Sequence, residues 1–167
     1  RNHLRRAGRL QLIELRIILR AHQHRQVAPE PSRRPHDPQR GLGGVQLITS
    51  DDHAGLRAAR LAVFGGIPWQ RCQFHLQQNA QAYVPHKNMQ SEVADDIRTI
   101  FNAPDRTTAD AYLAKAVLKY EQVASRLSDW MANNLPEGLM VFSFPAGFRK
   151  LLRTTNGVER LHREVRR

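Results

Sequence analysis

The sequence predicts an α/β fold that is mostly helical, and three observations lead to this prediction. The β-branched run Val45–Thr49 is short enough for a buried strand, and an acidic turn and a helical pattern over His53–Phe64 follow it. Residues Trp69–Phe74 form a second stretch of strand length. Longer helical patterns occupy residues 88–134. A strand, a turn and a helix in this order make one unit of an α/β fold.

Turn residues bound the elements in the first half of this region. Gly43-Gly44 precedes the first strand, and Gly65-Gly66-Ile67-Pro68 ends the helix after it. The next helix is predicted over His75–Val84, and Pro85 stops it because proline cannot continue the hydrogen-bond ladder.

Two helical patterns lie between Asn88 and Asn134, and in both the apolar residues recur at intervals of three and four. We interpret these stripes as core, because this spacing is what packing against neighbouring helices requires. The first stripe is Met89, Val93, Ile97, Ile100 and Phe101, and the second is Ala111, Leu113, Ala116, Val117, Tyr120, Val123, Leu127 and Trp130.

The last third of the chain alternates short elements with turns. An apolar run at Leu139–Phe142 and a turn at Pro145-Ala146-Gly147 precede a basic stretch. A final helix is predicted over Gly157–Arg167.

Composition limits the class of protein and its partners. The 167 residues carry a formal charge of +11, which favours anionic partners such as nucleic acid. No window approaches 18 consecutive apolar residues, so we expect no transmembrane helix, and the start lacks the apolar core of a secretory signal. The single cysteine, Cys72, excludes an internal disulfide and fits a reducing cytosol.

Most of the excess charge lies in the first 40 residues, which contain ten arginines, no lysine and three acidic residues. Within them Leu10–Arg20 is predicted as a short helix, whereas the Pro-, Arg- and His-rich stretch Val27–Pro38 has little to bury and is predicted to be extended or disordered. Two interpretations of this arm stay open. It attaches the protein to nucleic acid electrostatically, or it is GC-rich sequence read in the wrong frame.

Two places near the predicted strands carry residues capable of chemistry. Asp51-Asp52 follows the first strand, where open α/β sheets place ligand sites, but either residue would also serve as the cap of the next helix. Cys72 and His75 have the spacing of a zinc-binding pair, although a structural zinc site needs four ligands and there is no second cysteine. Packing or a local hydrogen bond is the alternative for that pair.

A third place is the segment Thr154–Arg167. Asn156 and Glu159 have the spacing of a capping box, and Glu159 and Arg163 that of a helical ion pair, so a purely structural role is available. Positive charge surrounds this acid, which suits a carboxylate that works beside phosphate. The surrounding residues are Arg149, Arg153, Arg160, Arg163, Arg166 and Arg167.

Three blocks in this order resemble the mutator-type transposases of bacterial insertion sequences. The first block is Gln39–Leu56, which contains Ser50-Asp51-Asp52-His53-Ala54-Gly55-Leu56. The second is Trp69-Gln70-Arg71-Cys72-Gln73-Phe74-His75 with Asn79, and the third runs from Arg153-Thr154-Thr155-Asn156 through Glu159-Arg160-Leu161 and Glu164 to Arg166-Arg167. The resemblance covers about residues 38–167 and leaves the first 37 unmatched.

The resemblance implies an RNase H-like catalytic core with a helical insertion at residues 88–134. In that family a DDE set of two Asp and one Glu binds divalent metal, Mg²⁺ or Mn²⁺, for DNA cleavage and strand transfer. The second acid of the set falls on Asp51 and the third on Glu159, and the family's Cys/His motif falls on Cys72 and His75. We expect Asp52 and His53 to shape the turn and Glu164 to pair with Arg160.

The resemblance also implies partners and a location. DNA is the expected partner, both as the ends of the insertion sequence and as the target, with the backbone positioned by arginines and not read by them. These arginines are Arg149, Arg153, Arg160, Arg163 and Arg166. A homo-oligomer of the full-length protein is expected, in the bacterial cytoplasm at the nucleoid and without a membrane.

The chain departs from the family at the first catalytic acid, which should lie several strands before Asp51. The only upstream Asp is Asp37, 14 residues away in the Pro/Arg-rich stretch, which leaves no room for those strands. We therefore expect a truncated or frameshifted transposase that is inactive alone, with an exposed sheet edge.

Two alternatives stay open. One is a DNA-binding remnant without catalysis, and the other is a fragment that a separately translated upstream piece completes.

Overall fold

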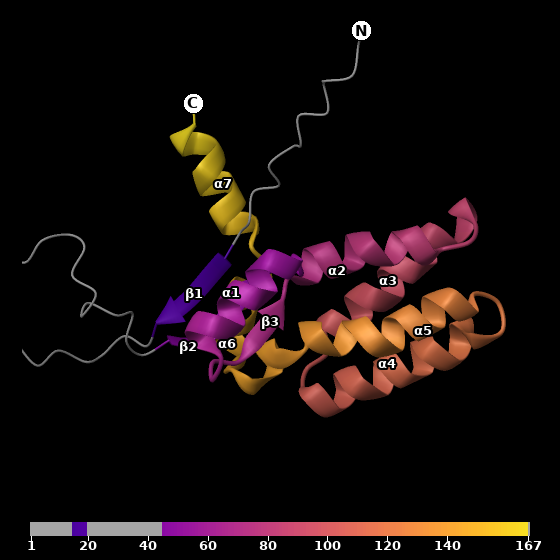
Figure 1. The fold of residues 1–167 in the computed structure, drawn as a ribbon. Helices are drawn as coiled ribbons and strands as arrows, with labels where there is room; N and C mark the ends of the chain where they lie inside the picture. The colour runs from indigo at the N-terminus through magenta and orange to yellow at the C-terminus, as the bar shows by residue number, and fades with distance from the viewer. Residues whose placement is uncertain (1–14, 20–44, 167) are drawn as a thin grey trace, which may run out of the picture.

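A computed structural model describes residues 15–19 and 45–166 of the chain, and in them a small sheet is joined to a larger set of helices (Figure 1). The strands are β1 (Leu15–Leu19), β2 (Val45–Ser50) and β3 (Trp69–Arg71). They lie in the order β1-β2-β3, with β1 antiparallel and β3 parallel to the central β2. The predicted α/β class, mostly helical, is confirmed in this part of the chain.

The helices follow the predicted order with one exception. They are α1 (Ala54–Phe64), α2 (Gln73–Ala80), α3 (Gln90–Phe101), α4 (Arg106–Glu121), α5 (Ser125–Asn134), α6 (Ala146–Leu152) and α7 (Asn156–Val165). Four short 3-10 helices join them: η1 (Gln81–Tyr83), η2 (Lys87–Met89), η3 (Leu135–Gly138) and η4 (Met140–Ser143). The exception is α6, which begins at Ala146, so the predicted turn at Pro145-Ala146-Gly147 is wrong; proline is tolerated at the start of a helix because the N–H that it lacks has no partner there.

The prediction of a helix over Leu10–Arg20 is wrong at residues 15–19, which form β1. A short apolar run fits a strand as well as a helix, and pairing with β2 decides between them here. The strand β2 lies between β1 and β3, so the edges of this three-stranded sheet are β1 and β3. The remaining predictions for the arm, residues 1–14 and 20–37, lie outside the described residues.

The second helical pattern of residues 88–134 is two helices and not one. The turn at Gln122–Ala124 separates α4 from α5, and the side chain of Val123 in this turn is 62% exposed, so its predicted place in the core is wrong. Ala111 is likewise exposed. The other members of the two stripes are buried or partly buried, as their spacing predicts.

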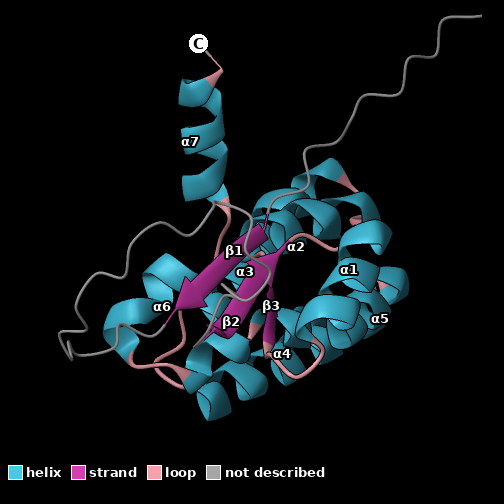
Figure 2. Ribbon diagram, turned by 60° about the vertical axis from the view of Figure 1, so that its left-hand side comes forward, coloured by secondary structure: helices cyan, strands magenta, loops and turns pink. Residues whose placement is uncertain are grey.

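A single hydrophobic core connects the sheet to the helices. Leu47 of β2, Leu76 of α2 and Leu152 of α6 belong to the same buried cluster as the inner faces of α3, α4 and α5. Helix α7 is different, because it stands away from the rest of the described chain (Figures 1 and 2). Its side chains Leu161 and Val165 are accordingly 61% and 78% exposed.

Candidate active site

The two acids singled out from the sequence lie on either side of one histidine. The Oδ1 atom of Asp51, directly after β2, is 3.7 Å from Nδ1 of His75, and Oε1 of Glu159 on α7 is 3.8 Å from Nε2 of the same ring. The side chains of His75 and Glu159 are about one-quarter exposed, and that of Asp51 is 43% exposed. The fold thus brings together three residues from β2, α2 and α7 in a partly open place.

Backbone and side-chain contacts hold the start of α7 against the sheet and thereby place Glu159. The hydroxyl of Thr49 in β2 donates to the carbonyl of Leu152 at 2.8 Å, and this bond is buried. The backbone N–H of Gln73 at the start of α2 donates to the carbonyl of Arg153 at 2.9 Å. Both bonds join residues far apart in the sequence, so the segment between α6 and α7 is attached to the elements that carry Asp51 and His75.

Thr155 links the Cys/His motif to the third acid. Its fully buried hydroxyl lies 3.5 Å from Sγ of Cys72 and donates to Oε1 of Glu159 at 3.3 Å. Thr155 is also the residue before α7, which makes the predicted capping box from Asn156 to Glu159 wrong. In the described part of the chain Glu159 pairs with Thr155 and His75 and forms no ion pair with Arg163. Its carboxylate therefore faces the site and not the solvent side of its own helix.

The Cys72 thiol and the His75 imidazole affect each other's ionisation. The hydrogen bond with Cys72 raises the pKa of His75 to about 9 against the opposing effect of burial, and the charges of Asp51 and Glu159 add to the rise. Burial alone raises the pKa of the Cys72 thiol, but hydrogen bonds with His75 and Thr155 outweigh it and leave that pKa lowered. The fully buried Cys72 acts in the structure as a support for the imidazole and for Thr155.

The described residues do not by themselves assemble a metal site. Among them no group of three or more His, Cys, Asp or Glu side chains is placed to hold an ion. Asp51 and Glu159 have the hard oxygen ligands that Mg²⁺ prefers, but they approach opposite nitrogens of His75. A zinc site at Cys72 and His75 likewise lacks its further ligands in this part of the chain.

The two neighbours of Asp51 shape the turn, as expected. His53 is the cap of α1, and its Nδ1 accepts from the backbone N–H of Gly55 at 3.2 Å, so neither Asp51 nor Asp52 caps the helix. Asp52 accepts from Nε of Arg57 at 2.9 Å. Asp51 Oδ1 accepts from the backbone N–H of Asp52 at 2.8 Å, which orients its carboxylate.

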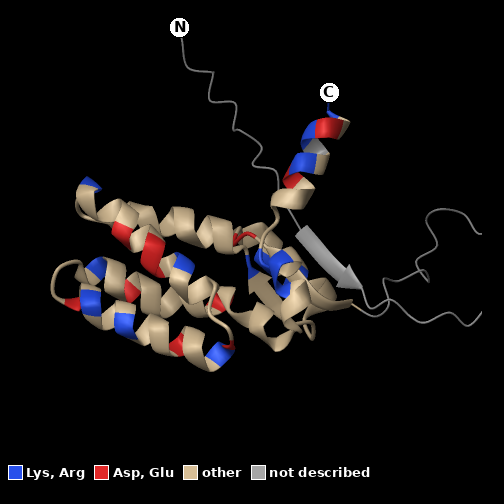
Figure 3. Ribbon diagram, turned by 180° about the vertical axis from the view of Figure 1, so that it is seen from behind, with Lys and Arg blue, Asp and Glu red and all other residues tan. Residues whose placement is uncertain are grey.

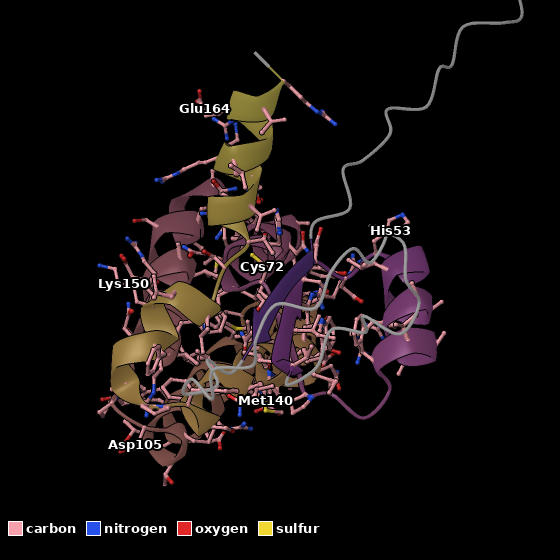
Figure 4. The ribbon with its side chains drawn as sticks, turned by 90° about the vertical axis from the view of Figure 1, so that its left-hand side faces the viewer. His53, Cys72, Asp105, Met140, Lys150 and Glu164 are labelled. Atoms are coloured by element: carbon pink, nitrogen blue, oxygen red, sulfur yellow. The ribbon has the colours of Figure 1, made fainter. Side chains whose placement is uncertain are left out.

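Glu164 lies apart from these residues. It is near the outer end of α7, whereas Cys72 lies beside the sheet (Figure 4). Glu164 is therefore not one of the side chains that the fold gathers around His75.

The five arginines predicted to contact DNA fall into two groups. Arg149 donates to the carbonyls of Phe144 and Pro104, at 2.9 and 2.6 Å, and Arg153 donates to Oδ1 of Asn102 at 2.7 Å, so both hold α6 against the end of α3. The other three are exposed and recur every three residues along α7, where basic side chains alternate with acidic ones (Figure 3). They are Arg160, Arg163 and Arg166.

Sequence reasoning did not find the buried ion pairs beside the site. Nη1 of Arg71, a side chain only 6% exposed, lies 3.4 Å from Oδ2 of Asp52 and 3.0 Å from Oε2 of Glu137. It also donates to Oδ1 of Asn134 at 3.0 Å. An arginine inside a predicted strand was the available signal, because a buried guanidinium requires partners. These pairs connect the turn after β2 to the end of the helical insertion.

No helix in the described part of the chain is long and apolar enough to cross a membrane. The family model described as "Transposase, Mutator family" matches residues 38–167. The chain therefore belongs to the Mutator family of transposases, as the resemblance indicated.

Curated relatives are transposases of insertion sequences. The transposase for insertion sequence element IS406 of Burkholderia multivorans is 54% identical over 128 residues, which is 77% of this chain and 33% of that protein. The transposase for ISRM5 of Rhizobium meliloti is 38% identical over 128 residues, 77% of this chain and 32% of that protein. The transposase for IS1081 of Mycobacterium tuberculosis is 36% identical over 135 residues, 77% and 31% of the two chains. The chain thus spans about a third of the length of these relatives.

Proposed function

We propose that residues 38–167 are part of an RNase H-like transposase catalytic domain that cleaves DNA and transfers strands at the ends of an insertion sequence. The proposal rests mainly on one observation. Asp51 and Glu159, 108 positions apart in the sequence, meet at the two nitrogens of His75. Membership of the Mutator family supports DNA as the substrate.

In this proposal Asp51 and Glu159 are two of three acids that bind a divalent cation, Mg²⁺ or Mn²⁺. The first acid of the set is not among the described residues, in which no group of three or more side chains is placed to hold an ion. The cation supplies stabilisation of the negative charge that develops when a phosphodiester is cleaved. Thr155 holds Glu159 toward the site.

A chimera tests this proposal. Residues 38–167 of this chain replace the matching segment of the Burkholderia multivorans transposase, which supplies the remaining two-thirds of the protein. We expect cleavage of DNA carrying the ends of its insertion sequence in Mg²⁺ or Mn²⁺, and loss of cleavage in Asp51→Asn and in Glu159→Gln. Asp110→Asn is the matched control, since Asp110 is an exposed helix carboxylate paired with Arg106 at 2.8 Å. A chimera with native circular dichroism that cleaves equally well with and without Asp51 contradicts the assignment.

A second function, DNA binding without catalysis, is favoured by the charge of +11 and by the incomplete metal group. It predicts that the chain binds duplex DNA with a steep salt dependence that EDTA does not change. The second function is favoured over the first if this binding survives Asp51→Asn and Glu159→Gln and if the chimera does not cleave DNA. If adding a separate upstream fragment to this chain restores cleavage, the chain is instead one part of a transposase that the upstream fragment completes.

A further inference from the structure

Two arginines of α1 are stacked on one tryptophan. The guanidinium carbon of Arg60 lies 4.8 Å from the ring centroid of Trp69, and that of Arg57 lies 5.6 Å from it. The spacing of three residues places both side chains on the same face of the helix. Attraction between a guanidinium and an indole face restricts the side chain, so each guanidinium is held in place before any ligand arrives.

The two arginines differ in their counter-charges. Arg57 pairs with Asp52 and lies 3.8 Å from Glu137. Arg60 forms no ion pair with any described residue, and its Nε atom is buried without a hydrogen-bond acceptor. The Nε atom itself is too buried for an external acceptor to reach. The Arg60 side chain is however partly exposed, so an anion can approach the terminal nitrogens of a guanidinium whose charge no described acid pairs.

Around Trp69 the described basic side chains outnumber the acidic ones by one, and the additional base is Arg60. Asp52 and Glu137 are shared between Arg57 and Arg71, two acids for two bases. Arg60 adds a positive charge that this cluster does not balance. The described chain therefore holds, beside Trp69, a preorganised cation with an open requirement for an anion.

A short series of contacts connects this cation to the candidate active site. The indole Nε1 of Trp69 donates to Oγ of Ser50 at 2.8 Å, and Ser50 directly precedes Asp51. Helix α1, which carries Arg60, begins three residues after Asp51. Arg60 is thus attached through Trp69 to the strand end that bears the acid.

We propose that Arg60 is a DNA-binding residue that contacts a backbone phosphate of duplex DNA, and that Trp69 orients it. The planar guanidinium matches phosphate oxygens, and stacking on an aromatic ring leaves its edge available for hydrogen bonds. This contact is separate from the arginines of α6 and α7. It rests on the proposed function in that DNA is the ligand, and it adds a second point at which the backbone is held beside Asp51.

The test is the salt dependence of DNA binding by the full 167-residue chain, measured by fluorescence anisotropy with a labelled duplex of arbitrary sequence. The slope of log K against log salt is negative, and removing one phosphate contact makes it less steep by about 0.9. We expect this change in Arg60→Gln. In Arg60→Lys, which keeps the charge but loses the planar group, we expect the wild-type slope with weaker binding.

Arg98→Gln is the matched control, because Arg98 is an exposed arginine of the helical insertion that is paired with Asp95. If the loss of any positive charge were responsible, Arg98→Gln and Arg60→Gln would change the slope equally, and that result overturns the proposal. Urea midpoints check that the Arg60→Gln variant remains folded. If that variant unfolds, the binding affinity of Arg60→Lys relative to the wild type tests the proposal instead.

The failures of the two proposals are distinguishable. A wild-type slope in Arg60→Gln, with normal binding by the wild type, removes Arg60 as a phosphate contact and leaves the proposed function intact. A wild-type chain that does not bind the duplex removes DNA as the ligand of both.

Discussion

Replacement of Gln70 by leucine tests how the sheet is joined to the end of the helical insertion. Gln70 lies in β3 and is fully buried. Its Nε2 donates to the carbonyls of Gly138 at 2.7 Å and of Arg71 at 2.9 Å, and its Oε1 accepts from the backbone N–H of Val141 at 2.8 Å. One side chain therefore satisfies backbone groups of both η3 and η4.

The cost of Gln70→Leu follows from what each bond leaves behind. The Val141 N–H loses its acceptor in buried surroundings, which costs about 1–3 kcal/mol, and each of the two lost donor bonds costs about 1 kcal/mol. The carbonyl of Gly138 keeps a second donor, Nε2 of Gln73 at 2.8 Å. After the gain from burying leucine atoms, we expect a loss of about 3 kcal/mol in the free energy of unfolding.

Gln73→Leu is expected to cost less, about 1 kcal/mol, because Gln70 still donates to the Gly138 carbonyl and no other backbone group is left unpaired. In the double variant that carbonyl loses both donors. The two substitutions are then expected to cost about 1 kcal/mol more together than the sum of their separate effects.

The assay is urea unfolding followed by far-UV circular dichroism, with Gln78→Leu as control because Gln78 is an exposed glutamine of α2. The control is expected to stay within about 0.5 kcal/mol of the wild type. The reasoning is refuted if Gln70→Leu is as stable as this control, or if the Gln70 and Gln73 substitutions add without any coupling.

Three further predictions concern the helical insertion. Asp105→Ala removes the carboxylate that accepts from the N–H of Thr108 at the start of α4, a bond that lowers the pKa of Asp105. The urea midpoint of the wild type should therefore exceed that of the variant above about pH 3.8, and the difference should vanish as the pH falls through the lowered pKa. Asp105→Asn, whose side chain also caps helices, should keep the stability that Asp105→Ala loses. Tyr120→Phe removes the hydroxyl that donates to Asp96 at 2.7 Å and should cost about 1 kcal/mol in the free energy of unfolding. In an ultraviolet titration the variant should lack one phenol, whose pKa burial and Asp96 raise to about 12. Equal titration curves for the wild type and the variant would contradict this. Leu127→Ala empties a fully buried position of α5 and should cost about 3 kcal/mol in urea unfolding, whereas Leu118→Ala, at a side chain 68% exposed, should cost less than about 0.5.

Local patterns predicted the strand β2 and the helix α1 well, because an apolar run, an acidic turn and a Gly-Pro break lie close together there. They failed where the decisive contact is distant. Nothing in the run Leu15–Leu19 distinguishes a strand from a helix, and its pairing with β2 depends on residues about 30 positions away. The division of α4 from α5 was missed for another reason. Gln122–Ala124 contain neither glycine nor proline, so the turn has no local signal.

The candidate site was predictable in part. Asp51, Glu159, Cys72 and His75 were named from motif blocks, but the blocks do not contain the geometry that connects them. The position of the imidazole between two carboxylates and the bonds of Thr155 depend on how α7 is attached to β2 and α2. Such arrangements need a three-dimensional structure, because no spacing along the chain encodes them.

The helical insertion contributes to the geometry of the site even though no acid of the site lies on it. The turn after β2 carries Asp51, and the adjacent Asp52 is fixed by Arg57 and by the buried Arg71. Arg71 in turn needs Glu137 of η3, directly after the insertion, because Asp52 is shared with Arg57 and a guanidinium only 6% exposed is costly without acceptors. A displacement of the end of the insertion would therefore break a buried ion pair and alter the turn that orients Asp51. The insertion and the acids consequently form one structural unit, and changes at Glu137 are expected to act on the site through Arg71 and not by contact with the substrate.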